Sequence, residues 1–253
     1  MCTGVRSKGR ALAVALSSLL AVSTSDAQQS RKEWEFTVAP YAWTAGVQGE
    51  VGIRDFVTDV DLSAIDLLED LRFATMLRLG ARYDRWRGTA DVIFVSIGAE
   101  RTFLHGERTR DVEFELREWI VHPTLGYTVF RSSGVSFEVV AGARYWNIRP
   151  ELSIARVGQP ARSASATIDW VDATLGARWA LQTSKRWSFD LTGNGGAGGA
   201  NNTWEAIGLA AYDLSSRWKL GAGYRYLSVD YDRKDRLLDF QMNGPLLGAE
   251  YRF

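Results

Sequence analysis

Hydrophobic and polar residues alternate along much of this chain, and the alternation is cleanest at the C-terminal end. Counting back in steps of two from the last residue gives an apolar series: Phe253, Tyr251, Ala249, Leu247 and Pro245. The residues between them include Arg252, Glu250 and Gly248. Because successive side chains of a β-strand point to opposite faces, this period of two predicts a final strand with an apolar face, a polar face and a terminal aromatic residue.

The same alternation, bounded by turn residues, predicts ten strands. They cover residues 34–49, 71–86, 88–103, 113–130, 135–153, 166–182, 187–197, 203–213, 218–231 and 237–253. Most are longer than the five or six residues usual in soluble sheets, and they reach the roughly 9–11 residues that a tilted strand needs to cross a bilayer. Length therefore favours a membrane barrel over a soluble sandwich.

The connections between these strands also alternate in length. Those after the even-numbered strands are short and basic, whereas several after the odd-numbered strands are longer, notably 50–70, 104–112 and 155–165. Short periplasmic turns that alternate with longer outer loops are typical of outer-membrane barrels. We therefore predict an all-β, antiparallel up-and-down transmembrane β-barrel of ten strands. Eight strands is the alternative if the glycine-rich segment 193–202 is one flexible loop.

Charged residues lie on the faces opposite the apolar ones. A charge that faces lipid at mid-depth would cost about 2–4 kcal/mol, so these residues are predicted to face the lumen. They form a predicted polar network of both signs: Arg78, Arg82, Glu118, His122, Glu138, Arg144, Asp172, Arg178 and Arg225. Opposite charges can pair across a narrow barrel, which favours a mostly plugged lumen or a narrow nonselective pore over an efficient porin. The orientation of 88–103 stays open, because apolar residues occupy both of its faces.

The N-terminal segment has the features of a secretory signal peptide. A basic start is followed by an apolar run over 11–22 and by Ser25-Asp26-Ala27, which has small residues at the first and third positions of a cleavage site. The run is about a dozen residues long, whereas a membrane-spanning helix needs roughly 20. We predict cleavage after Ala27, which also removes Cys2, the only cysteine, and a single barrel domain over 28–253. An N-terminal anchor helix is the alternative.

The composition agrees with a barrel. The 253 residues include 10 Trp, 9 Tyr, 11 Phe and 24 Gly, and the mean hydropathy is −0.16. Lipid-facing and lumen-facing residues alternate in a barrel, so its average hydropathy resembles that of a soluble protein. The formal net charge of zero argues against a nucleic-acid partner.

Residues with catalytic potential are scarce. His122 shares a strand face with Glu118, but residues four apart on a strand are about 13 Å apart, so a partner must come from a neighbouring strand, with Glu138 or Asp91 as candidates. We interpret His122 as part of the polar network and His105 as a solvated loop residue. The alternative is an outer-membrane enzyme that acts on lipid or peptide with a lumen histidine. We expect no catalytic residue, no metal and no cofactor.

The first outer connection combines acidic and apolar residues. Its apolar residues recur at helical spacing after Asp61 or Ser63 as a helix cap: Leu62, Ile65, Leu68 and Leu71. This spacing predicts a short amphipathic helix at the barrel mouth, where packing is favoured over a partner site. The acidic residues have no EF-hand spacing, so a solvated surface is favoured over a cation site.

The strand pattern, the signal peptide and the terminal strand together resemble small bacterial outer-membrane β-barrels of the OmpA-like and OmpW-like superfamily, including porin-family proteins. The resemblance transfers no functional residue. It implies the outer membrane of a Gram-negative cell, contact with outer-membrane lipids and lipopolysaccharide, and assembly by the barrel assembly machinery. That machinery would read a terminal signal formed by Leu247, Ala249, Tyr251 and Phe253. The oligomeric state stays open.

The same barrel can serve as a pore, an enzyme, an adhesin or a scaffold, so the resemblance does not supply a function. The first hypothesis is an integral outer-membrane protein that is not an enzyme. It would be structural or a narrow pore for small solutes, and a binding protein that uses its surface loops is a further alternative. The omptin proteases share the ten-strand count. They need a histidine–aspartate pair and an aspartate pair at the outer rim, and no spacing in this sequence matches that pattern.

Overall fold

The structure is a computed structural model that describes residues 33–53, 56–105, 108–156, 159–233 and 236–253. The signal peptide lies outside these residues, so its cleavage after Ala27 stays a prediction. Within the described segments, no helix has the length and apolar character required to cross a membrane.

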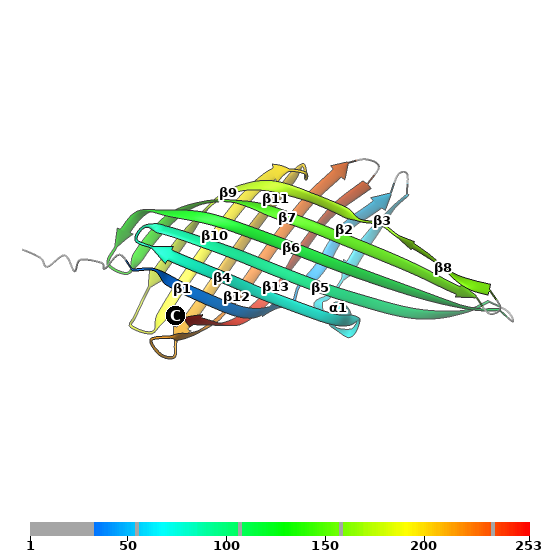
Figure 1. Ribbon diagram of the computed structural model, residues 1–253, viewed down its shortest axis with the longest axis horizontal. Helices are drawn as coiled ribbons and strands as arrows, with labels where there is room; N and C mark the ends of the chain where they lie inside the picture. Colours follow the sequence, from blue (N-terminus) through cyan, green and yellow to red (C-terminus); the bar gives the residue numbers. More distant parts are fainter. Residues whose placement is uncertain (1–32, 54–55, 106–107, 157–158, 234–235) are drawn as a thin grey trace, which may run out of the picture. The chain divides into compact units, whose positions relative to one another are not determined.

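Ten antiparallel strands form a closed barrel (Figure 1). Its wall consists of β1 (Glu35–Trp43), β4 (Leu71–Tyr83), β5 (Trp86–His105), β6 (Arg108–Ser132), β7 (Val135–Arg156), β9 (Ile168–Gln182), β10 (Trp187–Gly198), β11 (Asn202–Asp213), β12 (Trp218–Arg233) and β13 (Arg236–Arg252). Neighbours along the chain pair with each other, and β1 pairs with β13 through Thr37 opposite Arg252 to close the barrel. The predicted all-β, up-and-down architecture is confirmed.

The glycine-rich segment belongs to the barrel wall. Gly193, Gly195 and Gly196 of β10 pair with β9 on one side and with β11 on the other. The chain turns only after this ladder ends, between Gly198 and Asn202. The strand count is therefore ten, and the eight-strand alternative is wrong.

Three shorter strands extend the wall at the end opposite the short turns: β2 (Gly46–Ile53), β3 (Phe56–Leu62) and β8 (Gln159–Ser165). β2 pairs with both β13 and β3, and β8 pairs with β7. The strand predicted over 34–49 is thus β1 and β2, separated at Thr44 and Ala45. The long connections predicted from the sequence are largely β-structure, because antiparallel hairpins satisfy their own backbone hydrogen bonds.

The predicted helix at the barrel mouth is present as α1 (Ala64–Glu69). Ser63 is its N-cap: the Ser63 Oγ accepts a hydrogen bond from the Asp66 N–H at 3.2 Å, and the Asp66 carboxylate accepts one from the Ser63 N–H at 2.9 Å. Hydrogen bonding from Ser63 lowers the pKa of Asp66. Ile65 and Leu68 are 68% and 50% exposed, so the predicted packing of the apolar face is wrong.

Aromatic side chains form two bands on the outside of the barrel. Pairs near the short turns include Trp86 with Tyr127 and Trp218 with Tyr251, with ring centroids 4.8 and 5.0 Å apart. Further along the same strands lie Trp119, which packs against Phe94, and Tyr226, which stacks on Trp204. Eight residues separate the bands, or about 20 Å at a strand tilt near 40°, close to the roughly 25 Å apolar belt of outer-membrane barrels.

The lipid-facing residues lie between these bands, as predicted. Leu125, Leu175 and Leu220 are exposed on the outside, while alternate residues of the same strands are buried inside. The orientation of the strand predicted over 88–103, which the sequence left open, is given by β5. Asp91 and Ile93 are buried in the lumen, so Phe94 faces outward. Short turns face the periplasm in outer-membrane barrels, which assigns the end with Phe253 to the periplasmic side.

Candidate functional site

The lumen contains a buried network of ion pairs centred on Arg225, which is 1% exposed. Arg225 Nη1 donates hydrogen bonds to Asp91 Oδ2 at 3.0 Å and to the Tyr41 hydroxyl at 3.1 Å. Its Nη2 forms an ion pair with Glu205 Oε1 at 2.5 Å. Arg78 also contacts Asp91, at 3.3 Å. Four strands, β1, β5, β11 and β12, therefore meet at one guanidinium group inside the barrel.

Glu205 connects this group to a second buried arginine, Arg144. Arg144 Nη2 donates a hydrogen bond to Glu205 Oε2 at 2.7 Å, and Arg144 Nη1 donates one to Thr203 at 3.0 Å. His122 lies beside them, with Nε2 3.0 Å from the Thr174 hydroxyl and Nδ1 3.4 Å from Arg144 Nη2. We call Tyr41, Arg78, Asp91, His122, Arg144, Glu205 and Arg225 the central network.

The carboxylate nearest His122 is not one of the two expected from the sequence. Glu205 lies 3.7 Å from the His122 Nδ1, whereas Glu138 pairs with other arginines. Asp91 is directly opposite His122 in the strand register, but its carboxylate binds Arg78 and Arg225. The structure places His122 beside Thr174, Arg144 and Glu205 in the buried lumen.

A second cluster lies closer to the short turns. Glu138 accepts hydrogen bonds from Arg87 Nε at 3.2 Å and from Arg178 Nη1 at 3.1 Å. Arg178 also forms an ion pair with Asp190. The predicted lumen residues Glu138 of β7 and Arg178 of β9 therefore meet, and Arg87 of β5 and Asp190 of β10 contact them.

The other predicted lumen residues lie outside these two clusters. Asp172 is fully buried and accepts hydrogen bonds from Trp170 Nε1 at 2.9 Å and from the Ala200 N–H at 2.8 Å. Glu118 is half-buried and lies between Val95 and Ile148 in the strand register. Arg82 is half-buried and lines a cavity near the short turns.

On the outer side of the central network, aromatic and aliphatic side chains fill the lumen. Trp146 is fully buried and stacks on Trp170, with ring centroids 5.4 Å apart and planes within 11°. Phe240 meets the edge of Trp146, and Tyr231 packs against Trp170. Leu227 and Val229 of β12 are also completely buried here. We call this group the aromatic cluster, and together with the central network it occupies the middle of the barrel.

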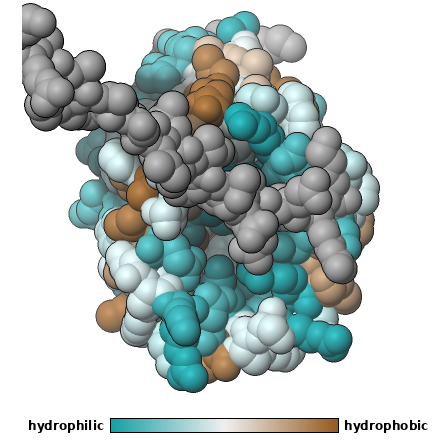
Figure 2. All heavy atoms as spheres, turned by 90° about the vertical axis from the view of Figure 1, so that its left-hand side faces the viewer, coloured by the Kyte–Doolittle hydropathy of each residue, from teal (hydrophilic) through white to brown (hydrophobic). Residues whose placement is uncertain are grey.

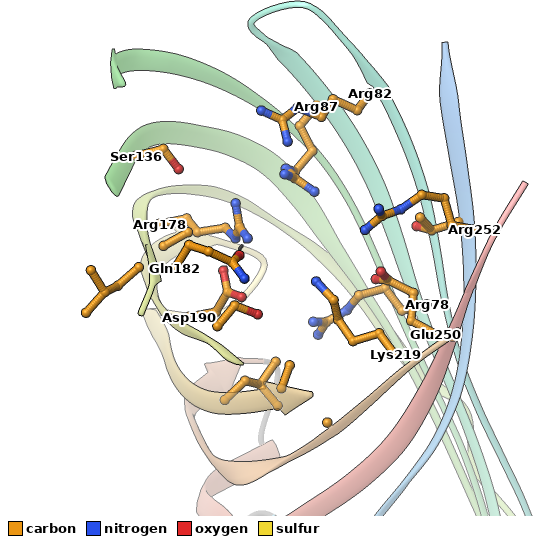
Figure 3. A pocket seen from close by; sticks show the side chains of 18 of the residues that line it. Arg78, Arg82, Arg87, Ser136, Arg178, Gln182, Asp190, Lys219, Glu250 and Arg252 are labelled. Atoms are coloured by element: carbon orange, nitrogen blue, oxygen red, sulfur yellow. Dashed lines mark hydrogen bonds and ion pairs between the residues drawn. The ribbon is translucent and has the colours of Figure 1, made fainter. Parts of the chain in front are cut away.

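Between the central network and the short turns lies a cavity of about 390 Å³, which we call the vestibule (Figure 3). Tyr41, Arg78 and Arg225 line its inner part, and none of Trp146, Trp170 and Phe240 does. Figure 3 shows Arg87 and Arg178 on one side and Lys219 and Arg252 on the other. Where its surface is not covered, the same end of the barrel is mostly hydrophilic (Figure 2).

Sequence reasoning missed Glu205, Arg87 and Tyr41 as members of the lumen clusters. Glu205 could have been found, because Thr203, Glu205 and Ile207 of β11 are buried while Trp204 between them is exposed. This is the alternation that identified the other strands. Arg87 could not be found in this way, because it comes directly after a turn, where the period of two is interrupted.

The predicted assembly signal lies on the outside of β13. Phe253 is 74% exposed and Leu247 is 65% exposed. The Phe253 N–H donates a hydrogen bond to the Phe36 carbonyl at 3.0 Å, and the Phe253 ring meets the edge of Tyr251. Ala249 pairs with Leu220 of β12. The terminal aromatic residue therefore sits at the seam where β13 joins β1.

Acidic and histidine side chains are the residues that could ligate a metal ion. Within the described part of the chain, no group of three or more His, Cys, Asp or Glu side chains is arranged to hold one. His105 was predicted to lie in a loop, which is wrong, because it is the last residue of β5. Its side chain is outside the described residues, so its exposure to solvent stays a prediction.

Comparison with known proteins shows similarity in fold alone. No family model and no curated protein sequence matches the chain. Among solved structures, the outer membrane protease OmpT from Escherichia coli has a TM-score of 0.63 at 9% identity, covering 88% of this chain and 98% of that one. The translocator domain of the autotransporter NalP from Neisseria meningitidis has a TM-score of 0.45 at 13% identity, with coverages of 90% and 92%.

The similarity to OmpT bears on architecture, since at this identity it carries no information about activity. It agrees with the closed antiparallel wall of ten strands. The chain thus has the fold of a bacterial outer-membrane β-barrel, and its lipid-facing exterior corresponds to a location in the outer membrane.

Proposed function

We propose that this protein is a non-enzymatic structural component of the outer membrane, with a lumen that is closed to solutes. One observation carries the proposal: the central network and the aromatic cluster occupy successive levels of the same lumen. Arg144, Trp146 and Arg225 are each at most 1% exposed. A solute would have to displace side chains at both levels to cross the barrel.

The charges in the central network support closure rather than selective conduction. Arg78, Arg144 and Arg225 are paired with Asp91 and Glu205 at 2.5–3.3 Å. A selective pore commonly presents charge of one sign to passing ions, whereas here opposite charges bind each other. Removing one partner from such a buried pair typically costs about 3–5 kcal/mol, which would oppose spontaneous opening.

Current recordings across planar lipid bilayers test the proposal. Refolded protein is expected to insert without discrete current steps. The narrow-pore alternative predicts steps of uniform size under the same conditions. Insertion is checked independently by the heat-modifiable gel migration that folded outer-membrane barrels show.

The proposed absence of enzymatic activity rests on the environment of His122. Its two ring nitrogens face Thr174 and Arg144, and the side chain is 6% exposed. His122 does not line the vestibule. A general base needs access to its substrate, which this position does not provide. OmpT is a protease, but a likeness in fold at 9% identity does not extend that activity to this chain.

The substitution His122→Ala tests this part of the proposal. Membranes that contain wild-type protein or the variant are expected to show the same peptide cleavage and the same lipid A composition. An activity that is present with the wild type and lost in a folded His122→Ala variant would establish the enzyme alternative.

Two partners are part of the proposal. The outward residues between the aromatic bands would contact outer-membrane lipids and lipopolysaccharide, as exposed Leu125 and Leu175 favour. The barrel assembly machinery would recognise the exposed terminal series that ends in Phe253. Both proposals are supported by the position of these side chains on the outer surface.

A further inference from the structure

Positive charge exceeds negative charge in the vestibule. Among the described residues that line it, there are seven arginines and one lysine against three carboxylates, those of Glu35, Asp190 and Glu250. The protein as a whole has a formal net charge of zero. The excess of cations is therefore a local property of this cavity.

Several of these cations are neutralised by nearby carboxylates. Arg87 and Arg178 share Glu138, and Arg178 also contacts Asp190. Arg252 forms an ion pair with Glu35 at 3.3 Å. At the inner end, Arg78 and Arg225 share Asp91. Lys219 lies 3.8 Å from Asp213. These pairs include the lining carboxylates Glu35 and Asp190 but not Glu250, and they leave two arginines without a carboxylate partner.

The two remaining arginines are Arg82 and Arg131. In the described part of the chain, neither forms an ion pair with a carboxylate. Arg131 donates to the Asp84 carbonyl at 3.0 Å instead, and the side chains of Arg82 and Arg131 both line the vestibule. Two like charges held beside a concave polar surface repel each other, and an anion between them would relieve that repulsion.

We propose that the vestibule is a binding site for a phosphate-bearing anion, held by Arg82 and Arg131 with Arg87 beside them. A guanidinium group presents a planar fork of donors that matches phosphate oxygens, and a phosphate group offers three acceptors and up to two negative charges. One phosphate can therefore bridge more than one arginine.

The ligand would bind without crossing the barrel. Tyr41, Arg78 and Arg225 close the end of the vestibule that lies in the middle of the barrel. Its opposite end opens among the short turns. The site is thus approached from the periplasmic side. It goes beyond the proposed structural role and does not depend on it, because a closed or a conducting barrel could hold the same anion.

Calorimetric titration with inorganic triphosphate tests the site. The full refolded barrel is kept in dodecyl maltoside, which carries no phosphate, at low ionic strength. The double variant Arg82→Gln/Arg131→Gln is expected to bind at least about tenfold more weakly than the wild type, which corresponds to about 1.4 kcal/mol. Neither side chain belongs to a described ion pair, so the variant should fold, and heat-modifiable migration checks this.

A matched control separates the effect of losing the site from the effect of lowering the net charge of the protein. Arg186 and Arg217 lie in short turns at the same end, are exposed, and donate to the hydroxyls of Tyr212 and Tyr251 rather than to the vestibule. Arg186→Gln/Arg217→Gln removes the same charge and should leave the affinity for triphosphate unchanged. Equal losses in the two double variants, wild-type affinity in Arg82→Gln/Arg131→Gln, or no binding to the wild type would overturn the proposal.

Competition then identifies the source of the phosphate. Dihexanoyl phosphatidylglycerol carries a phosphodiester headgroup, and glycerol 3-phosphate is a soluble monoester. If the lipid displaces triphosphate, the ligand is a phospholipid headgroup, and if only glycerol 3-phosphate does so, it is a soluble phosphate ester. Either result supports the site, and a failure of both to compete would contradict it.

Discussion

Glu205 lies between two buried guanidinium groups, and each of its carboxylate oxygens contacts one of them. The Arg144 contact is 2.7 Å and the Arg225 contact is 2.5 Å, and Asn194 donates a third interaction at 2.8 Å. Without this carboxylate, two positive charges would share a site from which water is largely excluded. At the residue scale, Glu205 is therefore the side chain on which the proposed closure of the lumen most depends.

The first prediction concerns Glu205→Gln. The amide keeps the shape of the side chain but removes its negative charge, which leaves Arg144 and Arg225 incompletely paired. We expect the free energy of unfolding to fall by about 3–5 kcal/mol, the usual cost of breaking a buried pair from one side. Urea-induced unfolding of vesicle-inserted protein, followed by tryptophan fluorescence, measures the change.

Glu35→Gln is the control for this prediction. Glu35 pairs with Arg252 at 3.3 Å, but both side chains are more than one-third exposed, and exposed pairs typically contribute less than about 1 kcal/mol. Equal effects of Glu35→Gln and Glu205→Gln would show that burial does not strengthen the central network.

Which residues face the lumen could be predicted from the sequence better than which of them form ion pairs with each other. Alternation is a local property, so it placed Arg144, Arg225 and His122 inside the barrel. Which of them meet depends on the tilt of the strands and the stagger of their register, which bring Arg144 of β7 to Glu205 of β11 across 61 residues of sequence. Local alternation contains no information about that distance, which is why Glu138 and Asp91 were the expected partners of His122.

At the scale of the elements, β9 and β10 approach each other closely at glycine positions. A Cβ atom on Gly176 would lie 2.1 Å from the Gly193 carbonyl oxygen and 2.6 Å from the Asn194 Cα. Backbone atoms cannot move aside as a flexible side chain can. The small residues of this segment therefore serve the tight packing of two wall strands.

The second prediction compares Gly176→Ala with Gly208→Ala. A Cβ atom on Gly208 of β11 would meet nothing within 4 Å, so it is the matched control. We expect Gly176→Ala to lower the free energy of unfolding by about 1–3 kcal/mol, as over-packing does, and Gly208→Ala to change it little. The same urea measurement applies. Similar values for the two variants would argue against a close β9–β10 contact.

The third prediction concerns the last strand. Phe253→Ala removes an exposed ring at the seam between β13 and β1 but keeps the backbone hydrogen bond to Phe36. We expect less folded barrel in the membrane and little change in the stability of protein refolded in vitro. Heat-modifiable migration of membrane fractions and urea unfolding measure the two quantities.

Phe36→Ala serves as its control, because Phe36 is also exposed and lies at the same seam. If both variants reach the membrane equally well, recognition of a terminal signal is contradicted. If Phe253→Ala is as unstable in vitro as it is scarce in the membrane, its role is structural.

The elements that the sequence did not predict lie at the outer end of the barrel. The segment 50–62 reads as a solvated acidic loop because of Asp59 and Asp61, yet 50–53 belong to β2 and 56–62 form β3. In a hairpin beyond the membrane both faces can meet water, so the pattern of apolar residues that marks a lipid-facing strand is absent. The helix signal of Ser63 and its following apolar residues was the exception there, and it located α1 correctly.

At the scale of the whole molecule, a lumen filled by side chains in its middle is combined with a positively charged cavity at one end. In the central network, Asp91 and Glu205 pair with all three arginines, whereas Arg82 and Arg131 of the vestibule have no carboxylate partner among the described residues. In the function we propose, the barrel is sealed in the middle while its periplasmic end is open and positively charged. The proposed structural role of the lumen would then be separate from the proposed binding role of its periplasmic end.

Single-channel recording of the wild-type protein tests closure most directly. A positive control is the triple variant Arg144→Ala/Trp146→Ala/Arg225→Ala, which removes side chains from both levels of the plug and should conduct wherever it folds. We expect a silent bilayer for wild-type barrels that are shown to have inserted, and current steps for the triple variant. Discrete steps of uniform conductance from the wild type would contradict a closed lumen.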